Sequence, residues 1–92
     1  MEFVVGHDHP CLPGHFPGSP LVPGVLVLDH VLAAIEAAQG PVGPLRLPQG
    51  KFVNPLRPGE RARVELDAGA SRWRFRVLRD ATLIASGEVV PA

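Results

Sequence analysis

The chain has 92 residues, of which 46% are apolar and 20% charged, and its nine basic and nine acidic residues give a net charge of zero. This composition excludes a disordered chain, and the length predicts a single domain over residues 1–92. The balanced charge argues against a general nucleic-acid binder. No apolar segment reaches the length of about 18 residues that is typical of a membrane span.

The single cysteine, Cys11, has no partner for an intramolecular disulfide, which is typical of a reducing compartment. The first residues lack the basic region and the long apolar region of a secretory signal peptide. We therefore expect a cytoplasmic protein that contacts no membrane.

The first half of the chain predicts a short strand, a loop and a helix. Residues 2–5 are apolar enough for an opening strand, and residues 6–24 contain nine of the 21 prolines and glycines. Residues 25–39 contain neither and are rich in Leu and Ala, which predicts a helix that ends at Gly40. Because so few of its residues are polar, we expect this helix to be buried nearly all round.

The second half of the chain predicts strands. Charged and apolar residues alternate over 61–66 and 72–77, which predicts strands with one solvent-exposed and one buried face. Residues 49–54 and 82–90 predict two more strands. We expect these four strands to form an antiparallel meander that is covered by the helix, in an α+β fold.

The loop before the helix contains the first candidates for chemistry. Residues 13–29 read PGHFPGSPLVPGVLVLD. A histidine in such a loop, like His15, is by itself most often solvated. Asp29 is unusual because a carboxylate is costly to bury in an apolar helix without a partner. From the helix alone, a structural role, in which Asp29 faces a solvent-filled gap or caps a neighbouring segment, is as well supported as a functional one.

The run HFPGSPLVPGVLVLD resembles the signature of bacterial 3-hydroxyacyl-[acyl carrier protein] dehydratases of the FabZ and FabA types. In that signature a histidine opens an HFPG turn, PG begins the central helix, and an acid follows the histidine by fourteen positions. Here His15 and Asp29 have this spacing, with the aspartate of the FabA type. The segment GKFVNPLRPGE resembles a later strand of the same family. The resemblance is strongest over residues 13–39 and extends to residue 60.

This resemblance implies a hot-dog fold, in which a curved antiparallel sheet wraps one long helix and two chains pair. We expect a homodimer or a higher oligomer of dimers. Only fourteen residues precede His15, fewer than is typical of the family. The chain is therefore similar to the short dehydratase-like proteins of aryl-polyene and related acyl pathways.

The resemblance also implies the reaction, which is loss of water from a 3-hydroxyacyl thioester to give the trans-2-enoyl thioester. His15 would take the C2 proton, since histidine transfers protons near neutral pH. Asp29 would assist the departing hydroxyl group, which an apolar surrounding favours by keeping the carboxyl protonated. No organic cofactor or metal is needed.

Four further residues are implied as the substrate-binding set. The backbone N–H groups of Gly24 and Val25, at the positive end of the helix, would bind the thioester oxygen. Phe16 would fix the turn. Leu21 would accept the second N–H of the histidine through its carbonyl oxygen.

The basic residues are concentrated in one part of the chain. All nine lie between residues 46 and 79, together with three acids, so this span carries a net charge of +6. The family resemblance implies that Arg72, Arg74 and Arg76 dock an acidic acyl carrier protein. The alternative is a solvated sheet face. RNA binding is less favoured because the neighbouring aromatic residues point to the opposite face.

Three other interpretations remain. His7, His9, Cys11 and His15 lie close together, but their spacing matches no strong zinc pattern, so we expect no metal. A hot-dog thioesterase also uses a carboxylate and a helix N-terminus, although it gives the HFPG histidine no role. A non-catalytic hot-dog protein that binds acyl chains or partners would contain the same groups.

Overall fold

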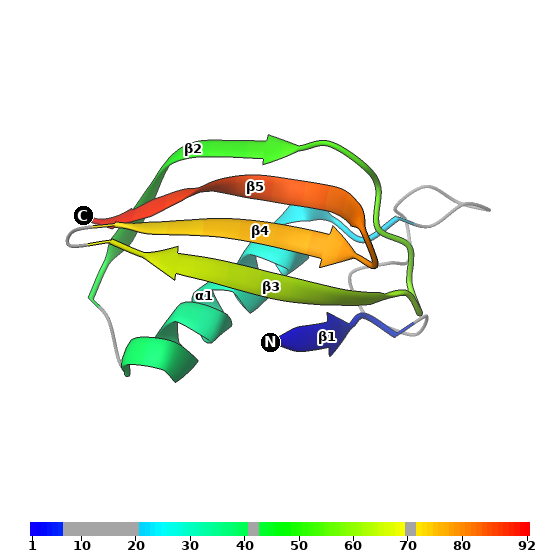
Figure 1. Ribbon diagram of the computed structural model, residues 1–92, viewed down its shortest axis with the longest axis horizontal. Coiled ribbons are helices and arrows are strands. Elements are labelled where there is room, and N and C mark those ends of the chain that lie inside the picture. The colour runs from blue at the N-terminus through cyan, green and yellow to red at the C-terminus, as the bar shows by residue number, and fades with distance from the viewer. Residues whose placement is uncertain (7–20, 41–42, 70–71) are drawn as a thin grey trace.

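One helix packs against a five-stranded sheet in the computed structural model, which describes residues 1–6, 21–40, 43–69 and 72–92 (Figure 1). The elements in chain order are β1 (Glu2–Val4), α1 (Gly24–Gln39), β2 (Leu45–Phe52), β3 (Arg61–Ala68), β4 (Trp73–Arg79) and β5 (Thr82–Pro91). The expected α+β composition is confirmed. The strand predicted over 49–54 is longer and begins four residues earlier, at Leu45.

The strand order differs from the predicted meander. The sheet is antiparallel with the order β1-β3-β4-β5-β2, so only β3, β4 and β5 follow one another as hairpins. β2 lies at the far edge and pairs with β5 (Figure 1). The prediction was wrong here because alternation of apolar residues reports which face a strand buries and not which strand it pairs with.

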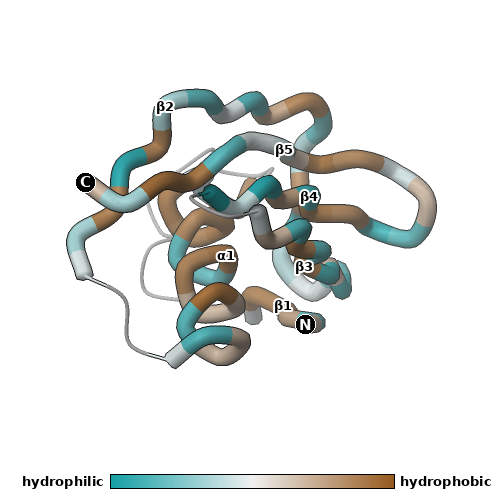
Figure 2. Tube along the Cα trace, turned by 60° about the vertical axis from the view of Figure 1, so that its left-hand side comes forward, coloured by the Kyte–Doolittle hydropathy of each residue, from teal (hydrophilic) through white to brown (hydrophobic). Residues whose placement is uncertain are grey.

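The core lies between the inner face of the sheet and one side of α1. Trp73, Phe75 and Val77 alternate inward along β4 and are 8%, 2% and 0% exposed. α1 contributes Val27 and Val31 from the side that faces the sheet. Figure 2 shows the helix against this one side of the sheet.

The opposite side of α1 is open in the single chain. Val25, Asp29 and Ala33, which are four residues apart and share one side of the helix, are exposed. The expectation of a helix buried nearly all round is therefore wrong for one chain alone. The physical reason is that one small sheet covers one side of a helix, and α1 contacts mainly β3 and β4.

The edge strand β2 approaches β5 unusually closely at Gly87. A Cβ atom at this position would lie 2.4 Å from the carbonyl oxygen of Gln49 and 2.8 Å from the ring of Phe75. Only glycine allows this approach, which follows an irregularity in the pairing between Arg46 and Gln49. From this point β2 stays paired with β5 as far as Phe52, its last residue, whose ring lies against Gly24 at the beginning of α1.

Candidate active site

The beginning of α1 presents free backbone donors. The helix follows Pro23, which has an extended ψ of 144° and provides no side-chain cap. The N–H groups of Leu26 and Val27 bond to the Pro23 carbonyl oxygen at 3.0 and 3.4 Å. Within the described residues, no acceptor bonds to the N–H groups of Gly24 and Val25. These donors and the helix dipole favour a negatively charged oxygen at this point.

An apolar cleft of about 490 Å³ opens beside these donors. One side is formed by the residues that lead into α1 and by its first turn, and the other side by the end of β2 and the segment that follows it. The lining residues are Leu21, Val22, Pro23, Gly24, Val27, Phe52, Val53, Asn54, Pro55, Leu56 and Ile84. The cleft has the size of a small-molecule site and is suited to an apolar chain.

Phe52 covers the helix start although more than half of its surface is exposed. A Cβ atom at Gly24 would lie 2.9 Å from Cζ of the Phe52 ring, and the residue is 53% exposed. The ring therefore rests directly on the glycine and forms part of the lining of the cleft. The sequence pattern predicts only a strand at Phe52, because no local pattern reports a contact with a residue 28 positions away.

Residues 52–56 form the outer wall of the cleft, and backbone hydrogen bonds hold both ends of this wall. The N–H of Val53 donates to the carbonyl oxygen of Ile84 at 2.8 Å. The N–H of Val22 donates to the carbonyl oxygen of Leu56 at 2.8 Å, which ties the wall to the segment before α1. The Nδ2 of Asn54 donates to the carbonyl oxygen of Leu83 at 2.7 Å. The cleft is therefore built from three parts of the chain that are far apart in sequence.

The structure places only part of the predicted catalytic set. It brings Leu21 and Gly24 together at the cleft, with Val25 beside them at the helix start and 63% exposed. His15 and Phe16 lie outside the described residues. Asp29 lies on the open side of α1 and is exposed, so the described residues of one chain do not give it the expected apolar surrounding.

His30, the neighbour of Asp29, has a packing role. Its ring stacks on Phe3 of β1, with centroids 4.1 Å apart and an angle of 6° between the planes. Phe3 is buried in the core. His30 therefore holds the short strand β1 against the helix.

The arginine-rich face of the sheet is confirmed, but its charges are largely paired. Arg72 and Arg74 contact the carboxylate of Glu88 at 2.7 and 3.6 Å, and Arg76 contacts Glu65. These pairs join neighbouring strands across the outer face of the sheet.

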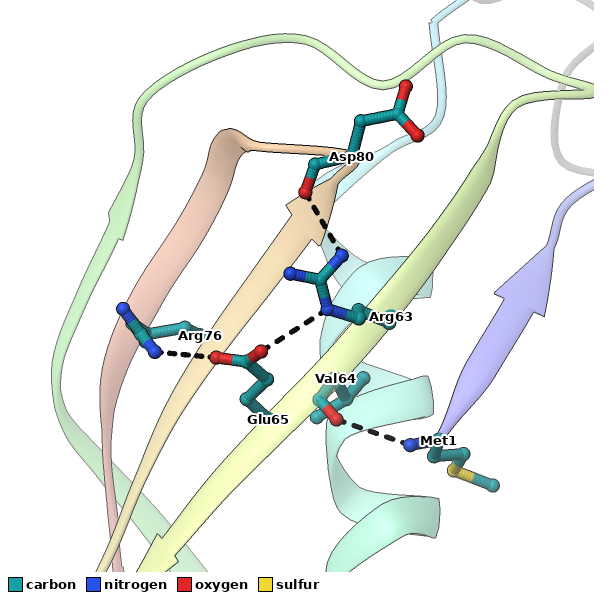
Figure 3. Close-up of polar contacts among 6 residues, drawn as sticks. All are labelled: Met1, Arg63, Val64, Glu65, Arg76 and Asp80. Carbon is teal, nitrogen blue, oxygen red and sulfur yellow. Dashed lines mark hydrogen bonds and ion pairs between the residues drawn. The ribbon is translucent and has the colours of Figure 1, made fainter.

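The ion pairs also shift the acid–base equilibria of the groups in them. The hydrogen bond from Arg72 holds the pKa of Glu88 below its usual value, and Glu88 in turn raises the pKa of Arg72. The pKa of Glu65 is lowered mainly by its hydrogen bond from Arg63, and Arg76 adds to the effect. Figure 3 shows Glu65 between these two arginines.

A broad concavity of about 900 Å³ lies over this face. Its lining contains four cations (Lys51, Arg72, Arg74 and Arg76) and three acids (Glu65, Asp67 and Glu88). The lining of the concavity is therefore strongly polar, but its net charge is close to zero. The sequence of residues 46–79, in contrast, carries a net charge of +6.

Two absences concern only the described part of the chain. No group of three or more His, Cys, Asp or Glu side chains in it is placed to hold a metal ion. The segment that contains His7, His9 and Cys11 lies outside it. No helix among residues 1–6, 21–40, 43–69 and 72–92 is long and apolar enough to cross a membrane.

The contact between Gly24 and Phe52 gives a testable prediction. Gly24→Ala should displace the aromatic ring and crowd the two free N–H groups, because the new Cβ would lie 2.9 Å from Cζ. We expect roughly a tenfold loss of turnover, less than the roughly 10²–10³-fold loss caused by removal of an oxyanion donor. The thermal midpoint should change little, since an exposed ring can move aside.

The matched control is Gly43→Ala, because a Cβ atom at Gly43 would meet nothing within 4 Å. Turnover and thermal unfolding of both variants are compared with those of the original chain. Equal turnover of Gly24→Ala and Gly43→Ala would contradict a role for the helix start in the reaction.

Known proteins resemble the chain over almost its whole length. A family model described as ApeI-like, ApeI dehydratase, matches residues 1–88. The 3-hydroxyacyl-[acyl-carrier-protein] dehydratase FabZ of Campylobacter jejuni is 33% identical, over 96% of this chain and 75% of the relative. FabZ of Thermomicrobium roseum is 32% identical, over 90% of this chain and 64% of the relative.

Solved structures have the same fold. A chain of the dehydratase heterocomplex ApeI:P from Xenorhabdus doucetiae superposes with a TM-score of 0.84 and 24% identity, over 97% of this chain and 81% of that chain. A point mutant of the fluoroacetyl-CoA-specific thioesterase FlK gives a TM-score of 0.58 with 21% identity, over 98% and 81% of the two chains. These likenesses confirm the expected hot-dog fold.

Proposed function

Because this chain belongs to the ApeI-like dehydratase family, it is a dehydratase of acyl biosynthesis, and we propose that it acts on a 3-hydroxyacyl thioester carried by an acyl carrier protein. One observation supports this proposal above the others. The apolar cleft is lined by Gly24, which carries one of the two free N–H groups and precedes Val25, which carries the other, so an acyl chain in the cleft could place its thioester carbonyl at these donors.

In the proposed mechanism two side chains each transfer one proton: His15 accepts one from the substrate and Asp29 donates one to it. His15 removes a proton from C2, and the electron pair of that C–H bond forms the C2=C3 double bond. The hydroxyl group leaves C3 with a proton from Asp29, which gives water and the trans-2-enoyl thioester. The N–H groups of Gly24 and Val25 stabilise the negative charge that develops on the thioester oxygen. Leu21 would accept the second N–H of His15 through its carbonyl oxygen, and Phe16 would hold the turn.

A homodimer would complete the site. The open side of α1, with Asp29 between Val25 and Ala33, is available to a second chain. The edge strand β2 has only β5 as a neighbour within the described part of the chain, so its other edge is also available. In a two-fold dimer, His15 of one chain would face Asp29 of the other, and the second chain would supply the apolar surrounding that Asp29 lacks.

The experiment that tests the proposed function incubates the protein with 3-hydroxyacyl thioesters on acyl carrier protein and on pantetheine. Mass spectrometry follows the acyl group. A loss of one water is expected. Release of a free 3-hydroxy acid would instead indicate a thioesterase, and binding without turnover would indicate a non-catalytic hot-dog protein.

Docking of an acidic carrier protein is proposed for the outer sheet face. The side chains of Arg72, Arg74 and Arg76 are 50%, 67% and 63% exposed, so a carrier can contact them even though each one is paired with a glutamate. Arg74 is the most accessible of the three arginines, and its contact of 3.6 Å with Glu88 is the longest.

A cytoplasmic location is also proposed. It rests on the single Cys11, which is typical of a protein in a reducing compartment.

Arg74→Glu is expected to raise KM for carrier-bound substrate by roughly 3–10-fold at low salt, with a smaller effect at high salt. The matched control is Arg61→Glu, because Arg61 is similarly exposed at 71% and does not line the concavity. Kinetics with a pantetheine substrate separate docking from chemistry. An equal rise in KM for the pantetheine substrate would contradict a docking role for this face.

A further inference from the structure

The segment between β2 and β3 forms the outer wall of the apolar cleft. Residues 52–56 line it without a break. Backbone bonds anchor this wall at Val53, through Ile84, and at Leu56, through Val22. Between these anchors, Asn54 also bonds to β5 through its N–H and its Nδ2. Pro55 has no N–H group and can form a backbone hydrogen bond only through its carbonyl oxygen. The stretch between Asn54 and Leu56 therefore depends on what binds this oxygen.

Arg79, the last residue of β4, binds it. Its Nη1 donates to the carbonyl oxygen of Pro55 at 2.9 Å and to Oε1 of Glu60 at 3.1 Å. The same Oε1 accepts the N–H of Arg57 at 2.8 Å. The guanidinium thus joins the wall at Pro55 to the end of the β4–β5 hairpin, and the carboxylate joins the guanidinium to Arg57, the second residue after Pro55. We call Arg79, Glu60 and the Pro55 carbonyl the wall clasp.

Arg79 is the least exposed of the arginines that form ion pairs among the described residues. Its side chain is 27% exposed and that of its partner Glu60 is 32% exposed. Water and salt screen a sheltered pair less. A hydrogen bond from a charged donor is also stronger than one between neutral groups. The bond to Glu60 is partly buried, and the exposed bond to the Pro55 carbonyl oxygen is strengthened by the charge of its donor.

We propose that Arg79 is a positioning residue that sets the width of the cleft through the wall clasp. It contacts neither the free N–H groups of the helix start nor Asp29, so it acts on the reaction through the wall. Because the cleft is proposed to hold the acyl chain, this role in catalysis rests on the proposed function. It predicts that Arg79 controls the binding of long acyl chains and leaves proton transfer nearly unchanged.

The decisive variant is Arg79→Met, which keeps the apolar stem and removes the guanidinium. Its matched control is Arg63→Met. Arg63 also lies on the outer face and donates to a backbone oxygen, that of Asp80 at 3.0 Å (Figure 3). Its side-chain hydrogen bonds go to Asp80 and Glu65 and not to the wall. Both variants lose one arginine and one hydrogen bond to a carbonyl group. Only the first releases Pro55.

The first readout is hydrogen exchange, which needs no enzymatic activity. The N–H groups of Val53 and Val22, which anchor the wall, should exchange roughly tenfold faster or more in Arg79→Met, the effect of losing a bond from a charged donor. In Arg63→Met they should exchange as in the original chain. Unchanged exchange at Val53 and Val22 in folded Arg79→Met would overturn the proposal, whether or not the chain proves to be a dehydratase.

The second readout is the kinetics of short and long 3-hydroxyacyl pantetheines. Arg79→Met should raise KM for the long chain by roughly tenfold, the size of one charged hydrogen bond, with kcat within about twofold. An equal fall of kcat for both chain lengths, with KM unchanged, would overturn the positioning role. If Arg79→Met does not fold, Arg79→Lys is compared with Arg63→Lys by the same two readouts, and equal behaviour of these variants would overturn it.

Discussion

His15→Ala is expected to lower the dehydration rate by roughly 10²–10⁴-fold, the contribution of a positioned general base. The expected effect is large because removal of the C2 proton begins the proposed reaction. The fold should persist, since the sequence around His15, which is rich in proline and glycine, predicts a loop. Steady-state turnover and thermal unfolding measure the two expectations.

The matched control is His30→Ala, because His30 stacks on Phe3 and has no proposed part in the chemistry. This variant should lose stability, through the contact between β1 and α1, and keep its turnover per folded molecule. The two histidines are thus expected to show opposite phenotypes. Turnover like that of the original chain in folded His15→Ala would exclude the proposed mechanism.

Asp29→Asn is expected to abolish most of the turnover without loss of stability. The amide has nearly the shape of the carboxyl group but cannot deliver a proton to the departing hydroxyl group. Because the Asp29 side chain is exposed in the single chain and forms no hydrogen bond or ion pair with another described residue, its replacement removes no such contact from the fold. The thermal midpoint should be unchanged, or raised if a second chain covers the side chain.

The control for this variant is Glu36→Gln, which changes an exposed acid seven positions further along the same helix. It should keep both turnover and stability. A strongly destabilised but active Asp29→Asn variant would mean that Asp29 is a structural partner and not the acid.

Mixing the two inactive variants tests how the pair is shared. If His15 and Asp29 meet across a two-fold axis, a hybrid dimer of His15→Ala and Asp29→Asn chains has one site with both changes and one with neither. Random exchange of subunits should then restore roughly a quarter of the original activity. Confirmed exchange without any recovery would mean that each site lies within one chain.

Several features of this protein could be predicted from its sequence because they depend on short-range order. The absence of proline and glycine from residues 25–39 delimits the helix to within one residue of its observed start. The alternation over 61–66 and 72–77 correctly assigns the two faces of β3 and β4, with the arginines outside. The motif around Gly24 marks the helix start, where the cleft and the free donors are found.

Tertiary structure alone decided the strand order, the charge of the outer face and the wall of the cleft. β2 pairs with β5 and not with its neighbour in sequence, Glu65 and Glu88 neutralise much of the arginine face, and Arg79 reaches Pro55 across 24 positions. Periodicity and spacing report how a segment orients its own side chains, because these depend on dihedral angles close by in the chain. Which distant group meets them depends on how the elements pack, and no local pattern carries that information.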